Sequence, residues 1–217
     1  MKSKVTTIDV AMTKIKSGMT LMIPGFVNVG TPMKLVQAIC ERDYKDFHVI
    51  SNNAGTADVP GIGKLVIEKR VRMLTASHIG LNPEAGKLMI SGEMKVNLVP
   101  QGTLAERMRI GGAGIGGFLT PTGVGTVVEE GKQVIEVEGK KYLLELPLKA
   151  DVSIIKAWKA DESGNLVYRR VARNFNPLMA LAGAFVIAEA EHIVPVGELD
   201  PDIIATPGVV VDMLVQG

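Results

Sequence analysis

The sequence predicts an α/β fold: an open, mostly parallel sheet with helices on both faces, plus a small antiparallel hairpin region. In the first half of the 217 residues, short continuous apolar runs alternate with segments of helical periodicity. Glycine-rich or polar turns follow several of these runs, as expected where buried strands lead into helices. A two-strand pattern around a Glu-Gly-Lys turn appears in the second half.

Helix-capping and helix-breaking residues locate the helices and strands of the first half. Thr6 or Thr7 is placed to cap a first helix, which Gly18 ends. A buried strand at 19–23 and a glycine turn come next, and Thr31-Pro32 has the pattern of an N-cap followed by proline at the first helical position. The other expected strands are 47–51, 71–76 and 96–99, and the other expected helices are 32–42, 83–90 and 101–110.

The second half is less regular. Residues 111–125 are dense in glycine and proline, so no regular element is expected there. A hairpin is predicted at 129–146, with Glu138-Gly139-Lys140 as its turn. Asn176-Pro177 begins a helix, and the remaining strands are expected at 152–158, 184–188 and 209–214. No composition shift marks a linker, so a single domain over 1–217 is expected.

Composition excludes several classes of function. The 24 basic and 23 acidic residues nearly cancel, and aromatic residues make up only 4%, so no nucleic-acid partner is expected. The single cysteine, Cys40, excludes an internal disulfide and is predicted to be a buried core thiol. His48, His78 and His192 lack metal-ligand spacing, so no metal is expected.

Neither a signal peptide nor a membrane span is expected from the sequence. The first ten residues hold no apolar stretch of signal-peptide length. No apolar run approaches the ~18 residues that a membrane span needs. We therefore expect a soluble, cytoplasmic protein in a reducing compartment, with no membrane partner.

Candidate site residues lie where predicted strands end, because open parallel sheets bind ligands beyond the carboxyl ends of their strands. The turn 24–30 suits an anion, although glycine there also has a steric explanation, and both common nucleotide fingerprints are absent. Asn52 either contacts a ligand or makes an Asx-turn. Gln101 either donates to a substrate oxygen or caps a helix. The long glycine-rich stretch 111–125 is expected to bind a ligand or to contact another subunit.

Together these segments resemble the class I coenzyme A transferases, specifically their acetate and acetoacetate α subunits. The family pattern of three apolar residues, Gly-Gly-Phe, three variable residues and Gly-x-Pro matches 21–32. Further matches cover nearly the whole chain: Asn-Asn-Ala-Gly at 52–55, PQGTLAER and its glycines at 100–114, TPTGVGT at 120–126, ARNFNP at 172–177 and TPG at 206–208. One departure is Pro24, which replaces the first glycine and removes an N–H donor.

The resemblance implies an enzyme that moves CoA between short-chain carboxylic acids, such as acetate, acetoacetate and butyrate, through a glutamyl-CoA thioester with ping-pong kinetics. In two-subunit members the nucleophilic glutamate lies in a Ser-Glu-Asn-Gly motif of the β subunit, and this chain lacks that motif. It is therefore expected to supply half of an active site in a heterotetramer or larger complex. CoA and acyl-CoA are then substrates, and no permanent cofactor is expected.

The resemblance also assigns residues. Asn52 and Gln101 match supporting catalytic positions that contact the substrate. The expected CoA-binding segment is Pro24, Gly25, Phe26, Val27, Asn28, Val29 and Gly30. A channel or subunit contact is expected at Gly112, Gly114, Gly116, Gly117 and Phe118.

Two alternatives stay open from the sequence. One is a stand-alone enzyme related to sugar-phosphate isomerases, with an Asp/Lys or Glu pair at the strand ends. The other is a non-catalytic acyl-CoA-binding protein that needs no partner. Glu84, Glu93 and Glu106 fall near the predicted rim, where each also fits an ordinary surface position.

Overall fold

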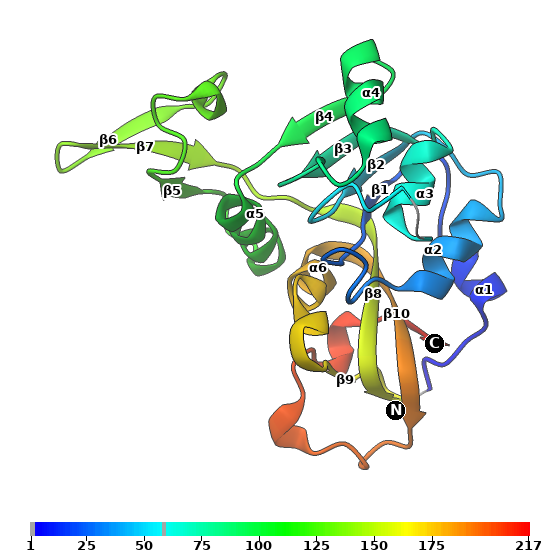
Figure 1. Ribbon diagram of the computed structural model, residues 1–217. Coiled ribbons are helices and arrows are strands. Elements are labelled where there is room, and N and C mark those ends of the chain that lie inside the picture. The colour runs from blue at the N-terminus through cyan, green and yellow to red at the C-terminus, as the bar shows by residue number, and fades with distance from the viewer. Residues whose placement is uncertain (1–2, 58–59) are drawn as a thin grey trace.

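The computed structural model describes residues 3–57 and 60–217. Among these, eight strands form one sheet: β1 (Thr20–Met22), β2 (Phe47–Ile50), β3 (Val71–Ala76), β4 (Lys95–Leu98), β8 (Ala150–Asp161), β9 (Leu166–Val167), β10 (Gly183–Val194) and β11 (Met213–Gln216). Their order is β11-β10-β8-β1-β2-β3-β4, all parallel, with β9 antiparallel beside β8 (Figure 1). The predicted fold class is confirmed.

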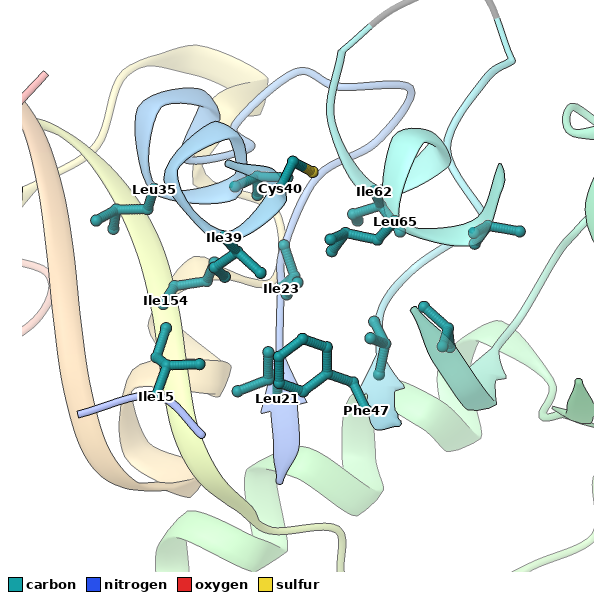
Figure 2. Packing of buried hydrophobic residues seen from close by; sticks show 14 of the residues in the cluster. Ile15, Leu21, Ile23, Leu35, Ile39, Cys40, Phe47, Ile62, Leu65 and Ile154 are labelled. Atoms are coloured by element: carbon teal, nitrogen blue, oxygen red, sulfur yellow. The ribbon is translucent and has the colours of Figure 1, made fainter. Parts of the chain in front are cut away.

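Helices cover both faces of this sheet. One apolar cluster joins it to α1 (Ile8–Met12), α2 (Met33–Cys40), α3 (Ile62–Ile67) and α4 (Pro83–Ser91), and Figure 2 shows part of that packing. A second cluster joins the other face to α5 (Gln101–Ala113) and α6 (Asn176–Ala182). In β1, Leu21 belongs to the first cluster and Met22 to the second, as the two-residue period of a strand requires. Burial on both faces explains why this strand is apolar throughout.

A smaller antiparallel sheet projects from the body beyond α5 (Figure 1). It consists of β5 (Phe118–Thr120), β7 (Lys140–Glu145) and β6 (Val134–Val137), in that order. Glu138 and Gly139 form its tight turn with φ of 51° and 75°, the type I′ geometry that suits two-residue hairpins. This confirms the predicted hairpin. Residues 115–146, which include this sheet, are called the arm below.

The expectation that 111–125 holds no regular element is wrong at two places. Helix α5 continues to Ala113, and β5 begins at Phe118. Gly111 and Gly112 allow other parts of the chain to pack closely against this helix. A Cβ on Gly111 would lie 2.1 Å from the carbonyl oxygen of Leu148, and one on Gly112 would lie 2.4 Å from Cβ of Leu181 in α6. Neighbouring backbones therefore approach α5 more closely than any larger residue would allow.

Other boundaries also differ from the prediction. Helix α3 was not predicted, although Ile62, Leu65 and Val66 have helical spacing and are buried. Strands β8 and β10 run for 12 residues each, well beyond their predicted ends, because they pair with each other along their length. Short 3-10 helices occur at η1 (Val127–Glu129), η2 (Arg170–Arg173), η3 (Pro201–Ile203) and η4 (Gly208–Val210). The last overlaps the strand expected at 209–214, which begins only at Met213 as β11.

Candidate active site

The predicted strand-end segments lie at one edge of the main sheet. From β1 the chain builds β2, β3 and β4 on one side, and later β8, β10 and β11 on the other, so the strand order reverses beside β1. Open α/β sheets bind ligands at such a switch point, beyond the carboxyl ends of the strands. The turn 24–30 follows β1, Asn52 follows β2, Ser77 follows β3, and Gln101 follows β4 as the first residue of α5.

The turn after β1 is a tight, strained loop. Phe26 and Val29 exchange two backbone hydrogen bonds of 3.0 Å, and Val27 and Asn28 between them have φ of 48° and 67°. Both central residues of a type I′ turn need positive φ, which suits asparagine and is unfavourable for a β-branched valine. Such strain persists only where the surroundings fix the conformation, typically at functional sites. The turn exposes Phe26, Val27 and Val29.

The segment around η2 fixes this turn from the far end of the chain. The side-chain amide of Asn174 donates to the carbonyl of Val29 at 2.8 Å, and that of Asn176 donates to the carbonyl of Gly30 at 3.0 Å. Asn176 also accepts from the backbone N–H of Lys156 at 2.7 Å and is fully buried. The loop after β1 accordingly lies beside α6 in Figure 1. The matched stretch at 172–177 therefore holds the turn in place.

Pro24 and Gly25 form the buried base of the turn. The carbonyl of Pro24 accepts a hydrogen bond of 3.1 Å from the hydroxyl of Thr31. The expectation that Thr31 caps the following helix is therefore wrong. Helix α2 begins at Met33, and Pro32 supplies no side-chain cap. The N–H of Leu35, in the first turn, instead donates to the carboxylate of Glu189 at 3.1 Å, so this helix end already holds an anion from its own chain.

The two asparagines of the loop after β2 have different roles. Asn53 accepts from the N–H of Gly55 at 2.8 Å, which is an Asx-turn and a structural role. Asn52 is 5% exposed, and its side-chain oxygen lies 3.5 Å from Oγ of Ser77. The backbone carbonyl of Asn52 accepts from the N–H and hydroxyl of Ser77, at 3.1 and 2.8 Å. Ser77 thereby fixes the position of the Asn52 backbone.

Ser77 also contacts Gln101. Its single hydroxyl hydrogen is shared between the Asn52 carbonyl and Oε1 of Gln101, and this arrangement leaves the amide N–H groups of Gln101 available to a ligand. The backbone of Asn52 and the side chain of Gln101 therefore lie on either side of one serine hydroxyl. The sequence reasoning missed Ser77, although its position directly after the strand at 71–76 was the same signal that selected Asn52.

Two adjoining cavities share Phe26, Asn52 and Gln101 as a common wall. The first has a volume of about 400 Å³ and is lined mainly by apolar groups, its other lining residues being Val29, Val171, Asn174, Phe175 and Leu178. The second has a volume of about 330 Å³ and is completed by Val27, Asn53, Ser77, His78 and Leu81. No acidic side chain is among the described residues that line either cavity.

The three rim carboxylates considered from the sequence are engaged elsewhere. Glu84 pairs with Lys87 at 3.2 Å, Glu93 with Lys69 at 2.6 Å, and Glu106 with Arg109 at 2.7 Å. The hydrogen bonds from Lys69 and from Arg109 hold the pKa of Glu93 and of Glu106 below the usual range, so both are ordinary ionised surface groups.

The glycines expected to line a channel lie apart from these two cavities. Gly112 and Gly114 line a different cavity of about 310 Å³ with Leu181 and Gly183. Gly116, Gly117 and Phe118 belong to the start of the arm. The described residues contain no group of three or more His, Cys, Asp or Glu side chains placed to hold a metal ion. Within the same residues, no helix is long and apolar enough to cross a membrane.

A family model described as "Coenzyme A transferase" matches residues 5–217. The chain belongs to the coenzyme A transferase family. It is 54% identical to the acetate CoA-transferase subunit alpha of Escherichia coli K12, covering 99% of this chain and 97% of that one. It is 46% identical to the acetoacetyl-CoA:acetate/butyrate CoA transferase alpha subunit of Clostridium acetobutylicum, covering 100% of this chain and 99% of that one.

Solved structures of coenzyme A transferases share the fold of this transferase chain. The acyl-CoA transferase of Escherichia coli O157:H7, in its thioester complex with CoA, superposes with a TM-score of 0.88 at 22% identity. The match covers all of this chain and 47% of that one, so this chain spans about half of that enzyme. The glutaconate CoA-transferase of Acidaminococcus fermentans superposes with a TM-score of 0.84 at 18% identity, covering 99% of this chain and 76% of that one.

Proposed function

We propose that this chain is the α subunit of a heteromeric CoA-transferase that exchanges CoA between short-chain carboxylic acids of the acetate, acetoacetate and butyrate class. Two of its relatives, at 54% and 46% identity, are α subunits of acetate and of acetoacetyl-CoA:acetate/butyrate CoA-transferases, which supports this substrate class. The observation that carries the proposal is the pairing of Asn52 and Gln101 across Ser77, beside cavities that no described carboxylate lines. Such a site has donors for a reacting oxygen but lacks the nucleophile.

A β subunit supplies the missing glutamate in this mechanism. Its carboxylate attacks the acyl-CoA thioester and expels the CoA thiolate, which leaves a mixed anhydride. The thiolate then attacks the glutamyl carbonyl, so that the donor acid leaves and a glutamyl-CoA thioester remains. The acceptor acid reverses these steps. Each attack develops negative charge on a carbonyl oxygen, and preorganised donors stabilise that charge.

The residues of this chain take three roles in the proposal. The amide groups of Asn52 and Gln101 donate to the substrate oxygens on which charge develops. Ser77 positions Gln101 by occupying its Oε1, which aims the amide N–H groups toward the substrate. The exposed part of the turn 24–30 provides the apolar wall against which acyl-CoA lies, while Pro24 and Gly25 support it from below.

The arm offers a contact surface for the β subunit. By the strand register, Leu119, Leu144, Tyr142, Ile135 and Val137 share one face of its sheet, and each is partly exposed or exposed. Lys140, opposite Val137, lies at the edge of the same face with its ammonium over the Tyr142 ring. On the opposite face Leu143 is fully buried. A small sheet with one open apolar face gains stability when another surface covers it. The segment from Gly112 to Phe118 runs from the last turn of α5 into the first strand of this sheet.

Neither alternative considered from the sequence is favoured. A stand-alone isomerase would need an acid–base pair in its cleft, yet Glu84, Glu93 and Glu106 are engaged in the surface ion pairs described above. A non-catalytic binding protein has no need of amide donors held at the wall between two cavities.

CoA transfer from acetoacetyl-CoA to acetate tests the proposal. The chain is assayed alone and after co-expression with the β subunit of a related transferase. We expect transfer only in the mixture. Transfer by the isolated chain would mean that the nucleophile lies among its own carboxylates. A stable complex without transfer would reject the substrate assignment.

A further inference from the structure

An arginine-rich segment borders the first cavity and has no role in the chemistry described so far. Arg169, Arg170 and Arg173 are exposed and lie within five residues of one another, at and just before η2. Two neighbours of these arginines, Val171 and Asn174, line the first cavity. Because the whole chain carries a formal charge of only +1, three guanidinium groups here make a local concentration of positive charge.

These arginines have no acidic partner in the described part of the chain. No ion pair there joins any of them to a carboxylate, whereas Arg42, Arg70, Arg107 and Arg109 each pair with one. Arg169 lies over the ring of Trp158 at 5.4 Å, and Lys159 adds a fourth cation over the same ring at 4.7 Å. Guanidinium groups without carboxylate partners can bind phosphate groups through paired N–H donors.

The backbone holds the segment in an unusual conformation. Arg170 has φ of 51°, a left-handed conformation that is uncommon for an arginine. The amide of Asn174 bonds both to Val29 of the turn and to the carbonyl of Val171, at 2.8 and 3.3 Å. The arginines are therefore attached to the same framework that fixes the cavity wall.

The order of chemical groups around the first cavity matches that of an acyl-CoA. Asn52 and Gln101 stand at the wall shared with the second cavity, where the thioester would react. Phe26, Phe175 and Leu178 provide an apolar lining suited to the pantetheine chain. The arginine segment lies at the border of that lining, and CoA carries its phosphate groups at the end remote from its sulfur.

We propose that Arg169, Arg170 and Arg173 form the binding site for the phosphate groups of the acyl-CoA substrate. The inference rests on the proposed CoA-transferase function, because it takes acyl-CoA as the ligand of the first cavity. The site contributes binding rather than chemistry, since it touches the part of the substrate that does not react.

The test uses the assembled α–β complex with Arg170→Gln and Arg173→Gln, singly and together. We expect each single change to raise KM for acetoacetyl-CoA by roughly threefold to tenfold, because each removes one exposed charge-assisted contact with a phosphate group. The KM for acetate should not change. The KM for acetoacetyl-pantetheine, which lacks the phosphate groups, should be the same in variants and wild type. Arg72→Gln is the matched control: Arg72 is exposed and bonds to the carbonyl of Asp46, near the start of β3 and away from the site.

Calorimetric titration of the complex with CoA measures the affinity of this site independently of the transfer reaction. Weaker CoA binding by the variants in a complex that cannot transfer CoA would support the site while rejecting the proposed function. Unchanged CoA affinity and KM would overturn the site, as would an equal rise in KM for the pantetheine thioester. Loss of complex formation in the variants would assign the arginines to the β-subunit contact instead, and would also overturn it.

Discussion

The backbone N–H of Leu35 donates a hydrogen bond to the carboxylate of Glu189, 154 residues later in the chain. This amide lies in the first turn of α2, where an N-cap side chain usually provides the acceptor. Glu189 is 1% exposed and also bonds to Lys156 at 3.2 Å, which in turn lies 3.6 Å from Glu191. The helix beside the candidate site is thus anchored to the far half of the sheet by the buried carboxylate of Glu189, which is paired with the partly buried Lys156.

Replacing Glu189 by glutamine should destabilise the protein by about 1–3 kcal/mol. The amide oxygen can still accept from Leu35, but the partly buried Lys156 loses its nearest carboxylate. Urea denaturation of the full chain measures the change. Glu191→Gln is the control: that side chain is 47% exposed, so the expected loss is below about 1 kcal/mol. Equal losses in the two variants would contradict the anchoring role of Glu189.

Gln101→Ala should lower kcat about 10²-fold in the assembled enzyme, because it removes a donor to the developing oxyanion. Ser77→Ala should have a smaller effect in the same direction, since Ser77 acts by orienting Gln101. If so, adding Ser77→Ala to Gln101→Ala should cost little more than Gln101→Ala alone. Steady-state kinetics of the three variants give the answer, and Ser77→Thr should restore the rate by keeping the hydroxyl. Additive losses would mean that Ser77 acts through the Asn52 backbone rather than through Gln101.

The sequence located the strand-end residues because one rule covers them all: parallel strands place their carboxyl ends at one edge. Asn52 and Gln101 were found that way, and Ser77 obeys the same rule. The residues that hold the site in place cannot be identified by this rule. Asn174 and Asn176 hold a turn some 145 residues away, and no local pattern encodes such a contact. The glycines at 111 and 112 were misread because close packing against Leu148 and Leu181 is invisible in a single chain segment.

Gly30→Ala should both destabilise the protein and raise KM for acyl-CoA. An added Cβ would lie 2.5 Å from the carbonyl oxygen of Ala172 and 2.5 Å from the amide nitrogen of Asn174, so the turn must shift. Gly18→Ala is a matched control, because Gly18 has φ of 84° against 80° for Gly30, with nothing within 4 Å of its Cβ position. It should show only the backbone cost of roughly 1–2 kcal/mol, with normal KM. A normal KM in Gly30→Ala would remove the turn from the CoA site.

Cys40 should react with thiol reagents only when the protein unfolds. It is buried, as the sequence predicted, and burial raises the pKa of its thiol to about 11, with a smaller contribution from Glu68. Because the folded pKa lies above the unfolded value near 9.0, the thiol's contribution to stability is complete below pH 9 and is lost as the pH rises through 11. The difference in unfolding free energy between wild type and Cys40→Ala should therefore shrink from pH 9 to 11. Rapid labelling of the native protein at pH 8 would contradict this.

The arm provides the sharpest test of subunit assembly, because β6 carries one exposed valine on each face. Val137 is 43% exposed and lies on the open apolar face with Leu119 and Tyr142, whereas Val134 is 39% exposed and lies on the face of Leu143. A glutamate at 137 would place a charge in the proposed contact with the β subunit, where its desolvation is costly. Val137→Glu should therefore abolish co-purification of the two subunits, while Val134→Glu should retain it. Retention in both variants, with normal molar mass by light scattering, would remove this face from the subunit contact.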